Sequence, residues 1–191
     1  MTDTVKKGFT LWRDKNGGYV TGGRLRHLID NGYNTSLGKG DPVRVSGGYI
    51  VVATDGSVVT GVFDGCKYID PNTRQTVESD LWPAGTSSGG RLEGQIDAIG
   101  YIIPAEGNSF ICKADASVSA AELGLTFGVS NAGSPNTQFK RSNCVLHASA
   151  NPSADNNMIQ VIGFPDIAGT AADDAETIVE VVFVNTGYVT V

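Results

Sequence analysis

Residues 41–63 read DPVRVSGGYIVVATDGSVVTGVF and hold three short runs of apolar and β-branched residues. The runs cover 43–45, 49–53 and 58–63. Ser46-Gly47-Gly48 separates the first two runs, and Asp55-Gly56 separates the second from the third. Asp-Gly between two apolar runs is a strong signal for a tight hairpin turn. The segment therefore predicts three short strands in succession.

The same pattern continues along most of the chain. Further strands are predicted at 75–77, 92–103, 109–113, 158–164 and 177–184. Glycine supplies 25 of the 191 residues, well above the usual share of ~7%, as many tight turns would require. Short strands at such spacing predict a mainly β chain that folds as a small β-barrel or β-sandwich. At most one short helix is expected, because Ser119 and Glu122 have capping-box spacing and Gly124 follows them.

Two regions differ from this regular pattern. Glycine pairs interrupt residues 1–40 too often for a long helix or strand. We therefore interpret residues 1–40 as an extended N-terminal arm on a β domain formed by residues 41–191. Within the arm, residues 24–29 are compatible with one or two helical turns and equally with an extended strip. Removal of residues 1–30 should then leave the β domain folded. The second region, about 114–157, is interpreted as a long loop-rich excursion.

Charge is distributed unevenly along the chain. The 14 Lys and Arg residues face 20 Asp and Glu residues, and the net charge of −6 disfavours nucleic acid as a partner. Residues 1–44 hold eight basic and four acidic residues, whereas residues 114–191 hold two basic and eight acidic ones. No apolar run approaches the ~18 residues of a membrane span, and no signal peptide is expected. The sequence has three cysteines and no Cys-X-X-Cys pair, so we expect a protein that is made in the cytoplasm and keeps its thiols reduced.

Nucleophilic or metal chemistry finds no support in the spacing of cysteines and histidines. Cys144 and His147 stand three positions apart, which puts their side chains on opposite faces of a strand, so we do not expect a nucleophile and base in contact. His27 lies 120 positions from the second histidine, and a histidine metal site is not expected. Without a cofactor motif either, the chain is predicted to bind no cofactor and not to be an enzyme.

The acidic residues that could form a catalytic or calcium site are predicted to lie in turns and loops. Asp55, Asp64 and Asp70 have Gly or Pro neighbours, and we interpret them as turn residues that bond the local backbone rather than as paired glycosidase acids. The acidic residues 173–176 lack EF-hand spacing and are interpreted as a solvated loop rather than a calcium site.

Several short motifs, taken in order, resemble those of virion structural proteins of tailed bacteriophages. They are GFTLWRDKNGG at 8–18, GDPV at 40–43, GVFDGCKYID at 61–70, LWPA at 81–84 and IQVIGFPD at 159–166. The order Gly-Asp-Pro-Val, Ala-Thr-Asp-Gly, Gly-Val-Phe is also similar to the small β domain of phage head decoration proteins. The resemblance spans most of the chain and is weakest over 115–157. Residues 185–191 depart from the family, which has a more charged tail there.

The resemblance implies a capsid decoration, or cement, protein that binds the outside of the phage head. Such a protein stabilises the shell against the pressure of packaged DNA. Its partner would be the major capsid protein, and its location the exterior of the virion, after synthesis in the host cytoplasm. The alternative function is a receptor- or carbohydrate-binding module of a phage tail, because glycine-rich loops with Tyr19, Tyr33 and Trp82 permit an exposed aromatic platform.

Aromatic and basic side chains are the expected capsid contacts, because such residues concentrate binding energy at interfaces. For Phe9 and Trp12, packing on their own domain is the alternative. Trp82, held extended by Pro83, either contacts the capsid or fixes a loop. The predicted contact residues are Phe9, Trp12, Arg13, Lys15, Arg24, Arg26 and Trp82.

A homotrimer at a local threefold position of the shell is also implied by the resemblance. Residues 177–184 add a physical argument, because Glu180 alone interrupts their nearly continuous apolar run. Such a run is typical of a strand covered on both faces. The second cover is either a neighbouring subunit or residues 130–157 folded back within the chain.

Overall fold

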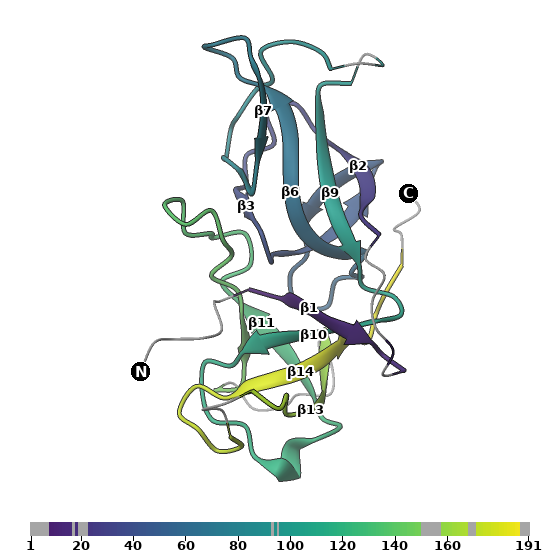
Figure 1. The fold of residues 1–191 in the computed structure, drawn as a ribbon, viewed down its shortest axis with the longest axis vertical. Helices are drawn as coiled ribbons and strands as arrows, with labels where there is room; N and C mark the ends of the chain where they lie inside the picture. The colour runs from purple at the N-terminus through teal and green to yellow at the C-terminus, as the bar shows by residue number, and fades with distance from the viewer. Residues whose placement is uncertain are drawn as a thin grey trace.

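The computed structural model describes residues 8–16, 18, 23–92, 94, 96–149, 158–167 and 171–187. These residues form fourteen strands and one short 3-10 turn, η1 (Ala120–Glu122). The strands build two lobes stacked along the long axis of the molecule (Figure 1). The mainly β architecture predicted from the short apolar runs is confirmed. Within the described ranges no helix is long and apolar enough to cross a membrane.

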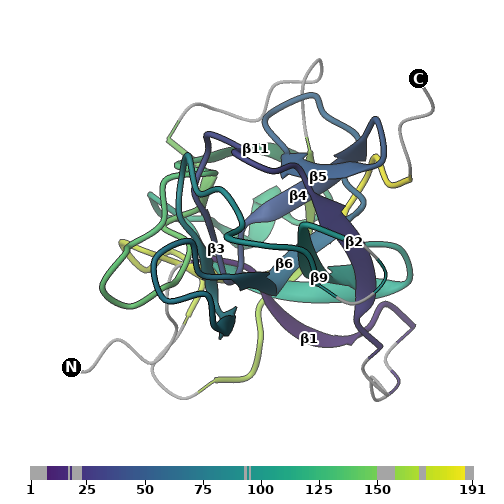
Figure 2. The same ribbon diagram turned by 90° about the horizontal axis from the view of Figure 1, so that it is seen from above.

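The upper lobe is a closed barrel of five strands. They are β2 (Leu25–Ile29), β4 (Pro42–Ser46), β5 (Tyr49–Val52), β6 (Gly61–Ile69) and β9 (Ala98–Pro104). In the order β4-β5-β2-β9-β6 the ring closes because β4 also pairs with β6, and Figure 2 looks down on this ring. The β2–β5 pair is parallel and the other pairs are antiparallel. β7 (Thr76–Ser79) extends the sheet beyond β6.

The lower lobe is a six-stranded antiparallel sheet that curls back on itself. Its strands are β1 (Thr10–Asp14), β10 (Asn108–Lys113), β11 (Thr126–Ser130), β12 (Val145–His147), β13 (Ile159–Gly163) and β14 (Ile178–Phe183). They follow the order β1-β10-β14-β13-β11-β12. A parallel bridge between Ala114 and Leu146 brings β12 beside the end of β10. A separate two-stranded sheet pairs β3 (Leu37–Gly38) with β8 (Leu81–Trp82).

Each lobe has its own apolar core, because alternate residues of its strands point inward. In the upper barrel, Phe63 and Ile102 are fully buried, as is Trp82. In the lower lobe, the ring of Phe183 lies 5.0 Å from that of Phe9 and 5.4 Å from that of Phe110. Burying a Phe side chain stabilises a fold by about 1.5–3 kcal/mol, so this three-ring cluster holds β1 firmly on the lobe.

The prediction of a separate arm is wrong for the part of 1–40 that the structure describes. β1 pairs with β10 in the lower lobe, β2 pairs with β9 and β5 in the barrel, and β3 pairs with β8. The glycines divide this segment into pieces that are each long enough for one strand, so they separate strands rather than prevent them. The two alternatives for residues 24–29 are resolved as an extended strand.

The 114–157 region contains more regular structure than a loop-rich excursion suggests. It contributes η1, β11 and β12, whereas residues 150–157 lie outside the described ranges. The predicted capping box is present at η1, where the Ser119 N–H donates to the Glu122 carboxylate at 2.7 Å.

Both faces of β14 are covered by the chain itself. Its inward residues join the lower core. On the outer face, Ile178 packs with Ile111 and Ile167, and Glu180 binds Arg13. Among the described residues, the contacts on this face come from β1, β10 and the segment after β13. The apolar run in β14 is therefore explained without a neighbouring subunit.

Asp41 joins the two lobes at their boundary. Its buried carboxylate accepts hydrogen bonds from the Gly38 N–H at 2.8 Å, the Ser142 hydroxyl at 2.6 Å and the Gly133 N–H at 3.2 Å. Gly38 belongs to β3, whereas Gly133 and Ser142 belong to the segment between β11 and β12. Burial raises the pKa of Asp41, because it penalises the charged form, although these hydrogen bonds act in the opposite direction.

Candidate partner-binding surface

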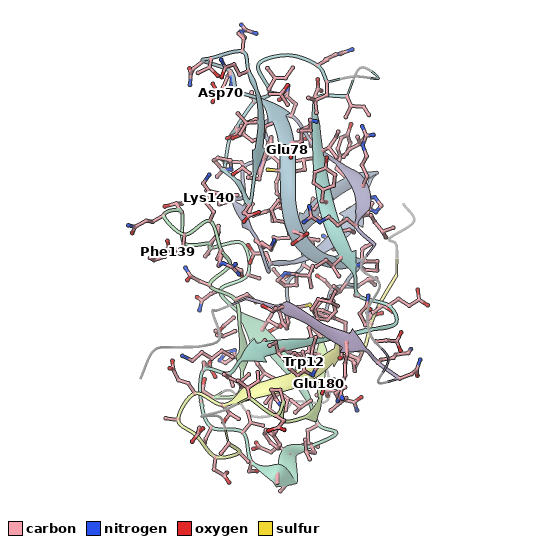
Figure 3. All side chains as sticks on the ribbon, in the orientation of Figure 1. Trp12, Asp70, Glu78, Phe139, Lys140 and Glu180 are labelled. Carbon is pink, nitrogen blue, oxygen red and sulfur yellow. The ribbon has the colours of Figure 1, made fainter. Side chains whose placement is uncertain are left out.

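The outer wall of the upper barrel carries two adjoining hollows that are open to solvent, with volumes of about 330 and 360 Å³. They share Tyr101, so we treat them as one surface and call it the barrel groove. Figure 3 labels two of its residues, Glu78 on β7 and Lys140 on a loop that rises from the lower half. The charged residues that line the barrel groove are Arg24, Arg26, Asp64, Lys67, Glu78, Asp80, Arg91 and Lys140.

Strand register assembles the middle of the barrel groove. Tyr101 on β9 stands directly opposite Arg26 on β2 and directly opposite Gly65 on β6. Two residues further along β6, Lys67 stands opposite Glu78 on β7, and their charged groups lie 3.3 Å apart. Since residues two apart on a strand share a face, these side chains form one row across four strands.

Gly65 keeps the floor of the barrel groove low. It lies at a register shift between β6 and β9 and has a φ of +134°, a conformation that L side chains rarely adopt. A Cβ atom at this position would lie 3.1 Å from the Ser79 carbonyl oxygen. The missing side chain therefore lets β6 lie close to Ser79 at the end of β7.

Asp64 is not the turn residue that its Gly neighbour predicts, because the preceding and following residues continue β6 without a break. Its carboxylate is almost fully buried. Arg24 Nε lies 2.5 Å from one carboxylate oxygen and Lys39 Nζ lies 2.8 Å from the other. Two cations thus neutralise Asp64, as a buried carboxylate requires.

The barrel groove is more basic than the chain as a whole. Five cations face three carboxylates along its lining, in a chain of net charge −6. Arg26 and Lys140 form no ion pair within the described part of the chain, and both are exposed. Unpaired cations on an otherwise acidic molecule favour an acidic partner surface and speed its encounter.

Two of the seven predicted contact residues are core residues. Phe9 is 3% exposed, and Trp82 is fully buried, with its ring 5.4 Å from that of Tyr68. The Trp82 indole N–H donates to the Tyr33 carbonyl oxygen at 3.2 Å. In this structure neither ring can touch a partner, so the alternative of packing within their own chain is the one observed. Trp82 fixes a loop against the barrel.

The other five contact residues divide between two places. Arg24 and Arg26 line the barrel groove, the former through its pair with Asp64. Trp12, 39% exposed, and Lys15 lie on or just after β1 of the lower lobe. The structure does not bring these two groups together in one contact surface. Tyr19, named above for an aromatic platform, lies outside the described residues.

Arg13, also on β1, has a structural partner. Its Nε donates to a Glu180 carboxylate oxygen at 2.7 Å, and its terminal nitrogen reaches the other oxygen at 2.5 Å. The Ser109 hydroxyl donates to the same carboxylate at 2.7 Å. Hydrogen bonding to Glu180 and its negative charge raise the pKa of Arg13. This two-pronged pair fastens edge strand β1 across β10 to β14.

The thiols are poorly placed for nucleophilic chemistry. Cys66, Cys112 and Cys144 are all buried and unpaired with one another. Burial, followed by the nearby charge of Asp80, raises the pKa of Cys66 to about 12, and burial also raises the pKa of the other two thiols. A nucleophilic cysteine requires a lowered pKa, so these thiols remain protonated at neutral pH.

His147 turns toward a carboxylate rather than toward Cys144. Its Nε2 lies 3.7 Å from an Asp115 oxygen, while Cys144 is fully buried. No group of three or more His, Cys, Asp and Glu side chains comes together in the described ranges in a way that would hold a metal ion.

Of the two other predicted turn carboxylates, Asp70 bonds the local backbone as expected, whereas Asp55 bonds a distant strand. Asp70 accepts hydrogen bonds from the Thr73 and Asn72 N–H groups at 2.8 Å each, which lower its pKa. The hairpin predicted at Asp55-Gly56 is wrong, because β5 and β6 on either side of this turn pair with β4 and not with each other. Asp55 lies in the turn between them and accepts the Val129 N–H of the lower lobe at 2.6 Å. The carboxylate thus ties a turn of the barrel to β11. Neither carboxylate is paired with a second acid.

Sequence patterns gave no sign of several residues of the barrel groove. Tyr101, Lys67 and Arg91 are scattered over 35 positions of sequence, and Lys140 comes from the lower half of the molecule. Only strand pairing brings them together, and no spacing rule encodes it. Comparison of the chain with protein-family models, curated proteins and solved structures finds no match. The resemblance to phage decoration proteins therefore remains a prediction from short motifs.

Proposed function

We propose that the chain is a non-enzymatic decoration protein that binds the outer surface of a tailed-phage head through the barrel groove. The observation that supports this most is a basic, open surface on a rigid barrel in an otherwise acidic chain. The ordered motifs that resemble phage decoration proteins supply the choice of partner, the major capsid protein.

A rigid docking face suits this task physically. Stable protein interfaces bury about 1,200–2,000 Å², and a symmetric shell repeats each contact many times. A closed barrel loses little conformational entropy on docking, which leaves more of the contact energy to hold the shell. Copies bound across joints between shell subunits oppose the outward pressure of packaged DNA.

Protein fits the barrel groove better than nucleic acid does. Asp64, Glu78 and Asp80 lie among its cations and would repel phosphates placed along the groove. Nucleic-acid sites concentrate cations with few carboxylates among them. Interleaved charges of both signs instead favour a partner with a complementary pattern.

Co-sedimentation with phage heads stripped of bound copies tests the proposal. Wild-type protein should bind the heads, and Arg26→Glu should bind about tenfold more weakly, because a charge in contact with an acidic surface is reversed. Lys15→Glu is the matched control on the lower lobe and should bind as the wild type does. Failure of the wild type to bind heads would contradict the proposal. Equal binding by Arg26→Glu and the wild type would show that the barrel groove is not the contact surface.

A carbohydrate- or receptor-binding module of a phage tail is the second candidate, and one observation favours it. The hollow of about 330 Å³ is lined by Tyr101 as well as by three acidic residues, Asp64, Glu78 and Asp80. Aromatic rings and fixed polar groups are the usual means of holding a polar ligand. Immunogold labelling of virions separates the candidates, since label on the tail would favour this one and label on the head the first.

The proposal also includes a homotrimer on the shell, which rests on the resemblance because β14 is covered within the chain. A threefold oligomer would bridge several shell subunits at once. Sedimentation equilibrium tests the free protein. A mass three times the 19.9 kDa of one chain is expected, and a single-chain mass at every concentration would limit the trimer to the shell.

A further inference from the structure

Phe139 presents the most exposed large apolar side chain in the described part of the molecule. It is 68% exposed, whereas the other exposed large apolar side chains are 37–46% exposed. Figure 3 shows it at the outer end of a loop that projects from the side of the molecule, next to Lys140. A single exposed apolar residue is common on a protein surface. Exposure alone therefore does not indicate a role, and the structure of the loop that carries Phe139 has to be considered.

The loop that carries Phe139 is a closed hairpin, residues 136–141. The Asn136 N–H donates to the Arg141 carbonyl oxygen at 2.8 Å, and the Arg141 N–H donates back to the Asn136 carbonyl at 3.3 Å. The Asn136 side chain accepts the Gln138 and Phe139 N–H groups at 3.0 Å each. Main-chain and side-chain bonds therefore both fix the backbone under the Phe139 ring.

The base of the 136–141 hairpin is attached to the barrel side of the molecule. The Lys39 N–H donates to the Lys140 carbonyl oxygen at 3.2 Å, and the Ser142 N–H donates to the Lys39 carbonyl at 3.0 Å. Ser142 is in turn bonded to the buried Asp41. At Gly38 a Cβ atom would lie 2.8 Å from the Arg141 backbone, so the hairpin packs closely on β3. An anchored hairpin holds its exposed ring in one place.

Cations lie beside Phe139 in the sequence and at the base of the hairpin. Lys140 is exposed beside Phe139 and also lines the barrel groove with Arg24. Lys39, at the base of the hairpin, points its ammonium group at Asp64 in the same groove. The 136–141 hairpin is thus continuous with the barrel groove and shares its basic character.

We propose that the 136–141 hairpin is a docking knob, whose Phe139 ring inserts into an apolar socket rimmed by carboxylates on the partner protein. Aromatic residues held in few conformations lose little entropy on binding and are frequent hot spots. Lys140 then pairs with the carboxylate rim, and the barrel groove extends the contact. The inference rests on the proposed function, in which that partner is the phage shell.

Binding to stripped phage heads, measured over a range of protein concentrations, tests the knob. Phe139→Ala should bind at least about thirtyfold more weakly, which corresponds to about 2 kcal/mol. Phe139→Tyr keeps the ring and should retain most of the affinity. Lys140→Glu should bind about tenfold more weakly, and more so at low salt. Leu125→Ala is the control, an exposed apolar residue of the lower lobe, and should bind like the wild type.

Each result bears on the knob. If the wild type binds heads and Phe139→Ala binds within threefold of it, the knob is wrong while the proposed function stands. Equal losses of head binding by Phe139→Ala and Leu125→Ala would show that the effect is not specific to the knob and would overturn it. A clearly lower melting temperature of Phe139→Ala would also overturn it, because the ring would then stabilise the fold. Loss of self-association in Phe139→Ala would place the socket on a second copy and overturn the capsid socket. If the wild type does not bind heads, the proposed function and the knob fall together.

Discussion

At the scale of single residues, Asp41 is a buried carboxylate on which several hydrogen-bond donors depend. It accepts three hydrogen bonds from donors that lie on both sides of the lobe boundary. Buried donors that lose their acceptor carry the full cost of their desolvation, about 1–3 kcal/mol each. Asp41 therefore helps to hold the two lobes together, beside the bond from the Val129 N–H to Asp55.

Asp41→Ala should lower the free energy of unfolding by about 2–5 kcal/mol, since it leaves the Gly38, Gly133 and Ser142 donors without their acceptor. Asp30→Ala is the matched control, because Asp30 is exposed and surface substitutions usually change stability by no more than about 0.5 kcal/mol. Urea denaturation of both variants measures the difference. Equal midpoints for Asp41→Ala and the wild type would contradict the role given to Asp41.

The stability difference between the wild type and Asp41→Ala should also depend on pH. Burial raises the pKa of Asp41 in the folded chain, so the folded state holds this proton more tightly than the unfolded state does. The contribution is fully present below the unfolded pKa of about 3.9 and is lost as pH rises through the raised folded pKa. Denaturation at several pH values should show the largest difference at the acid end, and a difference that grows with pH would contradict it.

The Arg13–Glu180 pair makes a second residue-scale prediction. Glu180 is 2% exposed, and a buried charge that loses its partner is strongly destabilising, whereas replacing both partners with apolar residues is often neutral. Arg13→Ala should therefore lower the melting temperature more than the double variant Arg13→Ala/Glu180→Leu does. Calorimetry of the two variants measures this order. The opposite order would show that the pair itself, rather than relief of a buried charge, stabilises β1.

At the scale of elements, β1 and β2 are integral strands rather than parts of an arm. Five main-chain pairings join β2 to β9, and β2 also contacts β5 to complete the barrel. β1 brings Phe9 and Arg13 to the lower lobe. Both lobes therefore depend on residues 8–29.

Removal of residues 1–30 should abolish cooperative folding, because it opens the barrel between β5 and β9 and uncovers the lower core. Thermal unfolding followed by circular dichroism checks this. A chain that lacks only residues 1–7 keeps every described strand and is the control. If residues 31–191 alone unfold cooperatively at the temperature of the full chain, residues 1–30 are not required for folding and the interpretation as a separate arm would be correct.

The sequence predicts some elements well and misses others for a physical reason. Runs such as 49–53 and 158–164 carry their own apolar pattern and turns, and they match β5 and β13. β1 has no buried residue and β2 has one, so neither carries a clear apolar pattern of its own, and their antiparallel partners β10 and β9 lie at least 69 positions away. The barrel groove escapes prediction for the same reason, because register alone sets Tyr101 beside Arg26. Phe139 carries no signal in sequence, since its exposure depends on how the hairpin is anchored.

At the scale of the whole molecule, charge and shape give the two lobes different characters. The upper barrel carries the basic barrel groove, and the 136–141 hairpin projects beside it (Figure 3). The lower lobe carries the acidic segment between β13 and β14, with Asp166, Asp173, Asp174 and Glu176. Under the proposed function, this polarity would place the groove side toward an acidic shell surface and the acidic segment toward solvent.

A density map of the intact virion tests the central claim most directly. The map should show two-lobed density on the outside of the head, at a regular position of the shell lattice, with the barrel groove and the 136–141 hairpin against the shell. Density of this shape on the tail, or heads whose outer surface lacks it in virions that contain the chain, would contradict the claim.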